Sequence, residues 1–282
     1  MTATVALSLC AALAFGISDY LAGVLSRRLR ILDLLAVGAP LGLLVVVAAL
    51  PLLPAQAVTG ADLAWGLLAG IAAALGVLAL LRGFRVGRFG VVSPVSSVGA
   101  AGIPVIAGLL LGEQPSPVVL AGLGAGIVSI WLVSSGSPEA QQGSRRTAAG
   151  LGEGLAAGVF FAAMFLLLSR ADLQSGPWPV AALQIGLLGV IGAALAGLRQ
   201  CPRVALRDVP AVAAVSVLGV LGTLAFIYAA WFGLVSIAAV VSAMSPAVTV
   251  LLARALIAEG FTPRQIVGLL CAGVAIVLIT LG

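Results

Sequence analysis

Long apolar runs separated by short polar or turn-rich links form the main pattern of this sequence. A helix needs about 20 apolar residues to cross the hydrocarbon core of a bilayer. The runs are continuously apolar, whereas the strands of a membrane barrel alternate between polar and apolar positions, so the pattern predicts helices. Ten transmembrane helices are predicted, over residues 4–25, 33–53, 63–81, 90–111, 117–134, 151–169, 178–198, 209–230, 235–256 and 264–281.

The longest polar stretch runs from Ser134 to Gly150, almost at the middle of the chain. It separates five predicted helices from five others, which makes it the natural linker between two halves. The sequence therefore predicts a first five-helix unit over residues 1–135, a polar linker over residues 136–149 and a second five-helix unit over residues 150–282.

The two halves match each other without gaps at an offset of 146 residues. Apolar segments match by chance more easily than mixed ones, so the matches of Glu and Pro are the informative ones. Matched pairs include Gly76 with Gly222, Ser96 with Ser242, Glu113 with Glu259, Pro117 with Pro263 and Gly122 with Gly268. Five crossings per half place the second half upside down relative to the first. Inverted repeats of this kind underlie alternating access in secondary transporters, although a duplication without moving parts would leave the same trace.

Composition excludes a soluble enzyme. Only 8% of the 282 residues are charged and 62% are hydrophobic, whereas a soluble domain is about a quarter charged. All basic residues are Arg, in small clusters between apolar runs, which is typical of membrane topology signals and not of nucleic-acid binding. The chain has no His, its three Cys lack metal-ligand spacing, and the phosphate-binding loop of ATPases is missing. We therefore predict no metal, no cofactor and no enzymatic activity, because a membrane enzyme needs a cluster of acids, bases or metal ligands.

Asp19 is the one acid of nine that lies well inside a predicted helix. A carboxylate at that depth costs on the order of 2.5–3.5 kcal/mol on insertion scales, so we expect it to face a polar cavity. Ser8, three helical turns earlier, and Phe15, one turn earlier, share its face and complete a candidate cavity wall. Asp19 would take up a proton or bind an amino group of the substrate. Alternatively, it lies near the interface and pairs with an arginine such as Arg82.

Small polar residues gather in the fourth and ninth predicted helices, which are equivalent in the repeat. Prolines in these helices free backbone carbonyls, which are tolerated in membranes where they line a cavity. We therefore expect a substrate site between the two helices, lined by Ser93, Ser96, Ser97, Ser242, Ser245 and Thr249. The alternative is that the small residues serve only close helix packing. Gln184 and Tyr228 are further candidates, although amphipathic aromatic residues also anchor helices at the interface.

Glu113 and Glu259 lie at the turns before the fifth and tenth predicted helices. We interpret both as structural, since each would accept hydrogen bonds from N–H groups at the start of the following helix, where Pro117 or Pro263 suits the first turn. A paired-carboxylate site is the alternative.

Glycine-rich faces on the fifth and tenth helices indicate close packing, either between the halves or between the subunits of a homodimer.

Several segments resemble the EamA-like branch of the drug/metabolite transporter superfamily, and the resemblance covers nearly the whole chain. They are Phe15-Gly16-Ile17-Ser18-Asp19-Tyr20, Gly87-Arg88-Phe89-Gly90-Val91-Val92-Ser93-Pro94, and the Gly112-Glu113 elbow with Pro117 and Gly122, echoed by Glu259, Pro263 and Gly268. The sequence departs from the family's pattern at Phe15, where Trp is common. It departs again at Phe160-Phe161, the second-half counterpart of the first-helix motif, which has no match for the Gly and the acid of that motif. The resemblance implies an all-helical fold and the export or uptake of a small metabolite.

We therefore expect a secondary transporter of the cytoplasmic membrane that exports or exchanges a small metabolite or drug-like compound by alternating access, with proton coupling as one option. Its expected partners are the substrate and the lipid bilayer, with no nucleic acid. A lipid-carrier flippase of the same superfamily and a non-transporting scaffold subunit are the alternatives.

The arginines predict an orientation. Thirteen lie in links after odd-numbered helices, and only Arg170 lies in the remaining links. Because the Arg-rich side of short links faces the cytoplasm, this count predicts that both termini lie outside the cytoplasm. The family resemblance implies the opposite, since both termini are usually cytoplasmic in that family.

Overall fold

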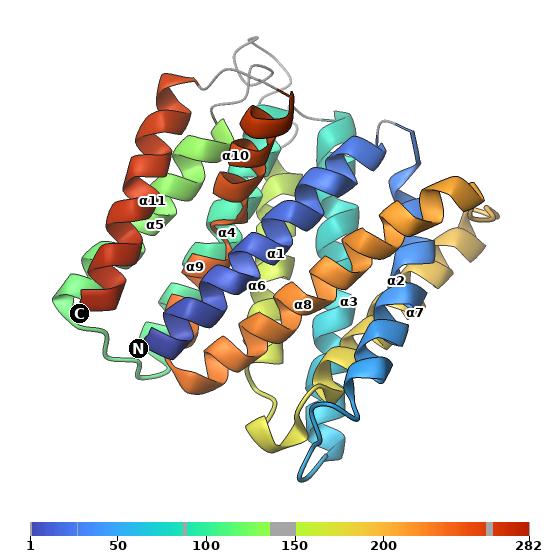
Figure 1. Cartoon of the computed structure of the whole chain (residues 1–282), viewed down its shortest axis with the longest axis horizontal. Helices are drawn as coiled ribbons and strands as arrows, with labels where there is room; N and C mark the ends of the chain where they lie inside the picture. Colours follow the sequence, from blue (N-terminus) through green and yellow to red (C-terminus); the bar gives the residue numbers. More distant parts are fainter. Residues whose placement is uncertain (1, 27, 87–88, 136–150, 258–261, 282) are drawn as a thin grey trace.

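The computed structural model describes residues 2–26, 28–86, 89–135, 151–257 and 262–281, which form an all-helical bundle (Figure 1). Its helices are α1 (Thr2–Ser26), α2 (Ile31–Ala49), α3 (Gly60–Val86), α4 (Phe89–Leu110), α5 (Pro117–Ser135), α6 (Leu151–Leu168), η2 (Leu173–Ser175), α7 (Trp178–Gly197), η3 (Leu206–Asp208), α8 (Val209–Phe232), α9 (Val235–Ser242), α10 (Ser245–Ile257) and α11 (Pro263–Leu281). Within the described ranges, nine helical stretches are long and apolar enough to cross a membrane, and Val95–Leu110 adds a shorter one. The prediction of about ten transmembrane helices is confirmed.

The ninth predicted helix is interrupted, because α9 ends at Ser242 and α10 begins at Ser245. Pro246 has no N–H group to donate to the carbonyl of Ser242. The N–H groups of Met244 and Ala247 bond carbonyls three residues back instead of four. The helix is therefore divided into two segments at the middle of this span, whereas its partner α4 runs on through both of its prolines.

The helix boundaries repeat at the offset found in the sequence. α5 and α11 begin at Pro117 and Pro263, and α4 and α9 begin at Phe89 and Val235. α1 starts at the end of the bundle where both chain termini lie, and α6 runs toward that end (Figure 1). We call the end with both chain termini the terminus end. The opposite end, which carries most of the described arginines, is called the arginine end.

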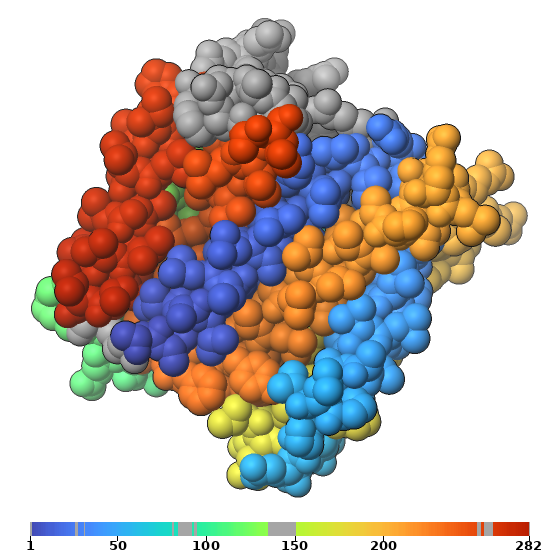
Figure 2. Space-filling view, in the orientation of Figure 1, coloured from blue at the N-terminus to red at the C-terminus, as the bar shows by residue number. Residues whose placement is uncertain are grey.

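The two halves interlock instead of lying side by side. α1 packs extensively on α8 of the second half, and the two run next to each other across one face of the molecule (Figure 2). The equivalent pair, α6 and α3, packs in the same way. Phe15 of α1 lies against Gly222 of α8, and Phe161 of α6 lies against Gly76 of α3. These contacts are exact counterparts at the repeat offset, so the core between the halves is built twice from the same residue types.

The glycine-rich faces of α5 and α11 pack against other helices of the same chain. A Cβ at Gly122 would lie 2.8 Å from Cγ1 of Ile279, and one at Gly268 would lie 2.8 Å from Cγ2 of Val133. Because α5 and α11 come from different halves, these glycines join the halves. A homodimer remains a prediction, and it would need a surface other than these glycines.

Two capping boxes that were not predicted begin α3 and α11. The carboxylate of Asp62 accepts the N–H of Thr59 at 2.9 Å, and the side-chain carbonyl of Gln265 accepts the N–H of Thr262 at 3.0 Å. The hydroxyl of each threonine accepts the N–H three residues later in return. The threonine-to-acid and threonine-to-glutamine spacing is a recognisable helix-start signal. Asp62 also accepts the N–H of Asp172 at 2.9 Å, which ties α3 to the link after α6.

Candidate substrate site

Gly16 allows α1 of the first half and α10 of the second half to come close together. A Cβ at this position would lie 2.7 Å from the carbonyl oxygen of Ser245 and 2.9 Å from Cγ1 of Val248, so a larger residue does not fit. The hydroxyl of Thr249 donates to the carbonyl of Gly16 at 3.0 Å and to that of Ser245 at 3.2 Å. Polar groups from both halves therefore meet at this contact.

Asp19 lies one helical turn beyond Gly16, on the side toward the arginine end. The hydroxyl of Ser245 donates to its carboxylate oxygen Oδ2 at 3.3 Å. The side chain of Asp19 is otherwise exposed, and that of Ser245 is half-buried. The carboxylate thus has one neighbour from the other half and an open side on which a further group can bind.

The ion pairs of the described residues leave Asp19 out. They join Arg30 to Asp33 at 2.8 Å, Arg82 to Glu153 at 3.7 Å and Arg207 to Asp208 at 3.8 Å. Arg82, the alternative partner for Asp19, therefore pairs with Glu153 in this structure. A carboxylate at membrane depth is costly unless it is protonated, hydrated or paired. Asp19 is accordingly suited to take up a proton or a cationic group.

The other two members of the predicted α1 stripe do not share the open side of Asp19. Ser8 is fully buried, and its hydroxyl donates to the carbonyl of Thr4 at 2.7 Å, within the same helix. Phe15 packs against Gly222 of α8. Each residue of a helix rotates by about 100°, so residues four apart are offset by about 40° and can turn toward different partner helices.

The serines of α4 and α9 lie in helix interfaces in this conformation. Ser96 is buried, and its backbone carbonyl would lie 3.0 Å from a Cβ at Gly158 of α6. Ser242 is 1% exposed, and its hydroxyl has no hydrogen-bond partner among the described residues. Ser97 is half-buried, and the side chain of Ser93 lies outside the described part of the structure. The close-packing alternative therefore accounts for Ser96 better than the cavity reading does.

Gln184 and Tyr228 have packing roles of their own. Gln184 is buried on α7 against Gly42 of α2. Tyr228 is half-buried and meets Trp231 edge to face, with ring centroids 5.0 Å apart. The indole N–H of Trp231 donates to the carbonyl of Ala171 at 2.6 Å. Among the hydrogen bonds and ring contacts of the described residues, none joins Gln184 or Tyr228 to the Asp19 and Ser245 pair, so the structure does not bring these candidates together into one site.

Glu113 caps a different helix from the predicted one. Its carboxylate oxygen Oε1 accepts the N–H of Val235 at 2.7 Å and that of Ser236 at 3.4 Å, at the start of α9 in the other half. The following helix, α5, is capped instead by the hydroxyl of Ser116, which accepts the N–H of Val119 at 3.2 Å. The prediction that Glu113 caps the helix after it was therefore wrong. Glu259, its repeat partner, lies outside the described residues.

The turn before α5 explains why Glu113 reaches the start of α9. Gly112 has a φ of +94°, a conformation that glycine adopts without strain, and it turns the chain sharply after α4. A Cβ at Gly108 would lie 2.6 Å from Cδ of Glu113. The two glycines let the carboxylate fold back over the end of α4, where it reaches α9. Pro117 and Pro263 do begin α5 and α11, as predicted.

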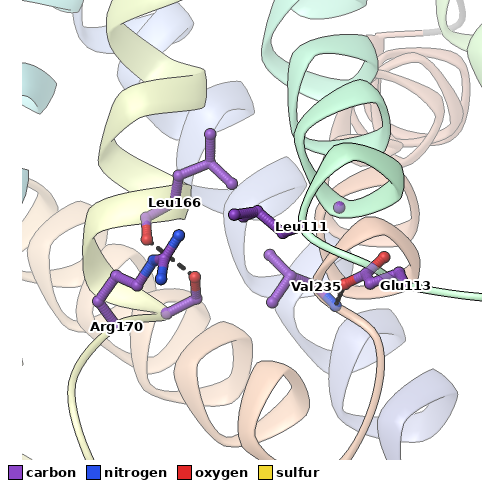
Figure 3. A pocket seen from close by; sticks show the side chains of 7 residues that line it. Leu111, Glu113, Leu166, Arg170 and Val235 are labelled. Atoms are coloured by element: carbon purple, nitrogen blue, oxygen red, sulfur yellow. Dashed lines mark hydrogen bonds between the residues drawn. The ribbon is translucent and has the colours of Figure 1, made fainter.

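A small cavity of about 210 Å³ lies beside Glu113 at the terminus end. Figure 3 shows Leu166 of α6 and Arg170, which follows the end of α6, on one side and Leu111, Glu113 and Val235 on the other. Gly108 and Ser169 complete the lining. The cavity lies between the ends of α4 and α6 and the start of α9, which is a boundary between the two halves.

Comparison with known proteins finds a family match for the second half of the chain. Residues 149–281 match the EamA-like transporter family. The second half of the chain is thus an EamA-like unit. The resemblance found in the motifs is thereby confirmed. The EamA match and the membrane-spanning helices together make the chain a multi-pass membrane protein of a transporter family.

The fold of this EamA-like chain is also that of a solved structure. A structure whose title reads only "Crystal structure of protein" superposes with a TM-score of 0.78 over 100% of this chain and 97% of that one, at 14% sequence identity. A likeness at that identity shows the shared fold. None of the curated proteins matches the chain.

Proposed function

We propose that this EamA-like protein is a secondary transporter that exports or exchanges a small metabolite or drug-like compound across the cytoplasmic membrane. The observation that supports the proposal is the position of Asp19, an exposed carboxylate between α1 of the first half and α10 of the second. A group bound there touches both halves. Alternating access requires a site whose surroundings change when inverted halves rearrange around it.

Asp19 has one of two roles in this proposal. It takes up a proton that moves against the substrate, or it binds an amino group of the substrate directly. The hydroxyl of Ser245 lies at 3.3 Å and orients the carboxylate. Because Asp19 lies in the part of α1 nearer the arginine end, the substrate reaches it from that end in the described conformation.

Substrate flux through the purified chain is the direct test. Reconstituted into sealed vesicles and offered a panel of metabolites preselected by thermal shift, the protein should exchange at least one compound faster than protein-free vesicles do. Flux restricted to lipid-linked compounds would favour the flippase alternative. Compounds that stabilise the protein without any flux would contradict transport and favour a scaffold subunit.

We also propose that the arginine end faces the cytoplasm, so that both termini lie outside it. Arginines in short links are retained on the cytoplasmic side during insertion, and thirteen of fourteen fall in links after odd-numbered predicted helices. A periplasm-only phosphatase fused after Gly282 should then be active, and a cytoplasm-only fluorescent protein at the same position should stay dark. The reverse pattern would contradict the proposed orientation and agree with the family's usual topology.

A further inference from the structure

The Glu113 carboxylate is a polar contact that crosses from one half of the protein to the other. It belongs to the turn after α4 in the first half and accepts two N–H groups of the first turn of α9 in the second half, at 2.7 and 3.4 Å. The first N–H groups of a helix have no partner within the helix and carry partial positive charge, so an ionised carboxylate is a strong partner for them. The local backbone is shaped for this contact, since a side chain at Gly108 would displace the carboxylate.

The start of α9 is buried beside this contact at the terminus end. Ser236, in the first turn of α9, is 1% exposed and its hydroxyl has no hydrogen-bond partner among the described residues. Just before α9, a Cβ at Gly233 would lie 3.0 Å from Cβ of Thr4 of α1. The small cavity of Figure 3 lies beside the contact, and Leu111 in its lining is 63% exposed. At the middle of the same span, the Asp19 side chain beside Ser245 is exposed.

We propose that Glu113 is the latch of the terminus end: its bond to the start of α9 holds the two halves together there, and it must break whenever that end opens. This inference rests on the proposed alternating access, and it adds a residue that determines which end is open. The interruption between α9 and α10 fits this role, because it divides the span into two segments, of which only α9 carries the bond to Glu113, while both pack on α1. Glu113 acts on the transport cycle by positioning α9 and does not touch the substrate.

Ser116 supplies a matched control. Its hydroxyl caps α5 by accepting the N–H of Val119 at 3.2 Å, but α5 and Ser116 belong to the same half. Glu113→Ala and Ser116→Ala therefore each remove one side-chain cap from one helix. Only the first of these changes breaks a bond between the halves.

The experiment measures the accessibility of each end in the full chain in vesicles. Cys10, Cys201 and Cys271 are replaced by alanine, and Ser236→Cys or Ser245→Cys is introduced as the reporter for the terminus end or for the Asp19 region. A small polar thiol reagent is added on both sides of the membrane, and the labelling rate is followed. Glu113→Ala should raise the rate at the Ser236 reporter about tenfold and lower it at the Ser245 reporter, because the population moves from one open end to the other. Glu113→Gln, which keeps a carbonyl acceptor without the charge, should give a smaller shift in the same direction.

Ser116→Ala should leave the ratio of the two labelling rates unchanged, even where it lowers thermal stability. If the ratio of the two labelling rates is the same in the Glu113→Ala protein and its parent, the latch is overturned. It is also overturned if Ser116→Ala shifts that ratio as much as Glu113→Ala does. The labelling needs no substrate, so it is independent of the transport assay. Flux without a labelling shift would reject the role of Glu113 and keep the proposal of transport. A labelling shift without flux would support the role of Glu113 and contradict transport.

Discussion

Replacing Asp19 with Asn is expected to abolish gradient-driven uptake of the substrate found in the vesicle assay. The substitution keeps the size of the side chain and an oxygen for the hydroxyl of Ser245, but it removes the charge and the site for a proton. We expect the uptake rate to fall by at least about a factor of ten, which corresponds to roughly 1.4 kcal/mol in the barrier. The measurement is initial uptake into vesicles with an imposed proton or substrate gradient.

Counterflow exchange in the same variant separates the two roles of Asp19. If the carboxylate only carries a proton, exchange of substrate for substrate should continue in Asp19→Asn and should lose its pH dependence. If the carboxylate binds an amino group, exchange should fail together with uptake. Uptake that keeps the rate and the pH dependence of the native protein would remove Asp19 from the mechanism.

Two controls define the specificity of this result. Asp172→Asn removes the charge of an exposed carboxylate that caps η2 by accepting the N–H of Gln174 at 2.8 Å, and it should leave uptake unchanged. Ser245→Ala keeps the Asp19 carboxylate and removes one hydrogen bond of 3.3 Å, so its effect should be smaller than that of Asp19→Asn.

The fold was predictable because the length of each apolar segment and the turn residues between segments are local properties of the sequence. α5 and α11 begin at the two prolines that matched across the halves, and continuous apolar runs fill the helices between the links. The repeat predicted the equivalence of α4 with the α9 and α10 pair for the same reason. The interruption at Ser242 also has a local cause in Pro246, although proline alone did not distinguish this helix from α4, which continues through two prolines.

The contacts of the candidate residues were less predictable because they depend on partners far along the chain. Capping rules are local, and they assigned Glu113 to the helix that follows it, whereas the carboxylate reaches Val235 of the other half. A serine in a small-residue helix can face a cavity or a neighbouring helix. For Ser96 the choice was made by Gly158 of α6, which lets the backbones approach. Asp19 could be chosen as a candidate from the sequence, since a lone acid deep in an apolar helix is informative without knowledge of its neighbours, but its contact with Ser245 was not predicted.

Gly70→Ala is expected to cause a large loss of stability. Gly70 on α3 faces the backbone of α7, and a Cβ at this position would lie 2.9 Å from Cα of Leu183 and closer still to its carbonyl oxygen. Gly66, one turn earlier on α3, meets the backbone of Pro179 in the same way. A backbone carbonyl cannot rotate away as a side chain can, so α3 and α7 must separate. Overpacking a buried contact costs about 1–3 kcal/mol, and we expect a loss at or above the upper end of that range.

Gly189→Ala is the matched control for Gly70→Ala, because a Cβ at Gly189 of α7 would have no heavy atom within 4 Å. There the methyl group only replaces a poor helix former by a good one, so the free energy of unfolding should stay equal or rise by up to about 1 kcal/mol. Unfolding in mixed micelles of mild detergent and dodecyl sulfate, followed by circular dichroism, measures both variants against the native protein. Since single helices remain inserted and helical when their packing is lost, a large part of the helical signal should persist after the transition of the Gly70 variant. Equal stability of the Gly70 and Gly189 variants would mean that α3 and α7 do not pack through these glycines.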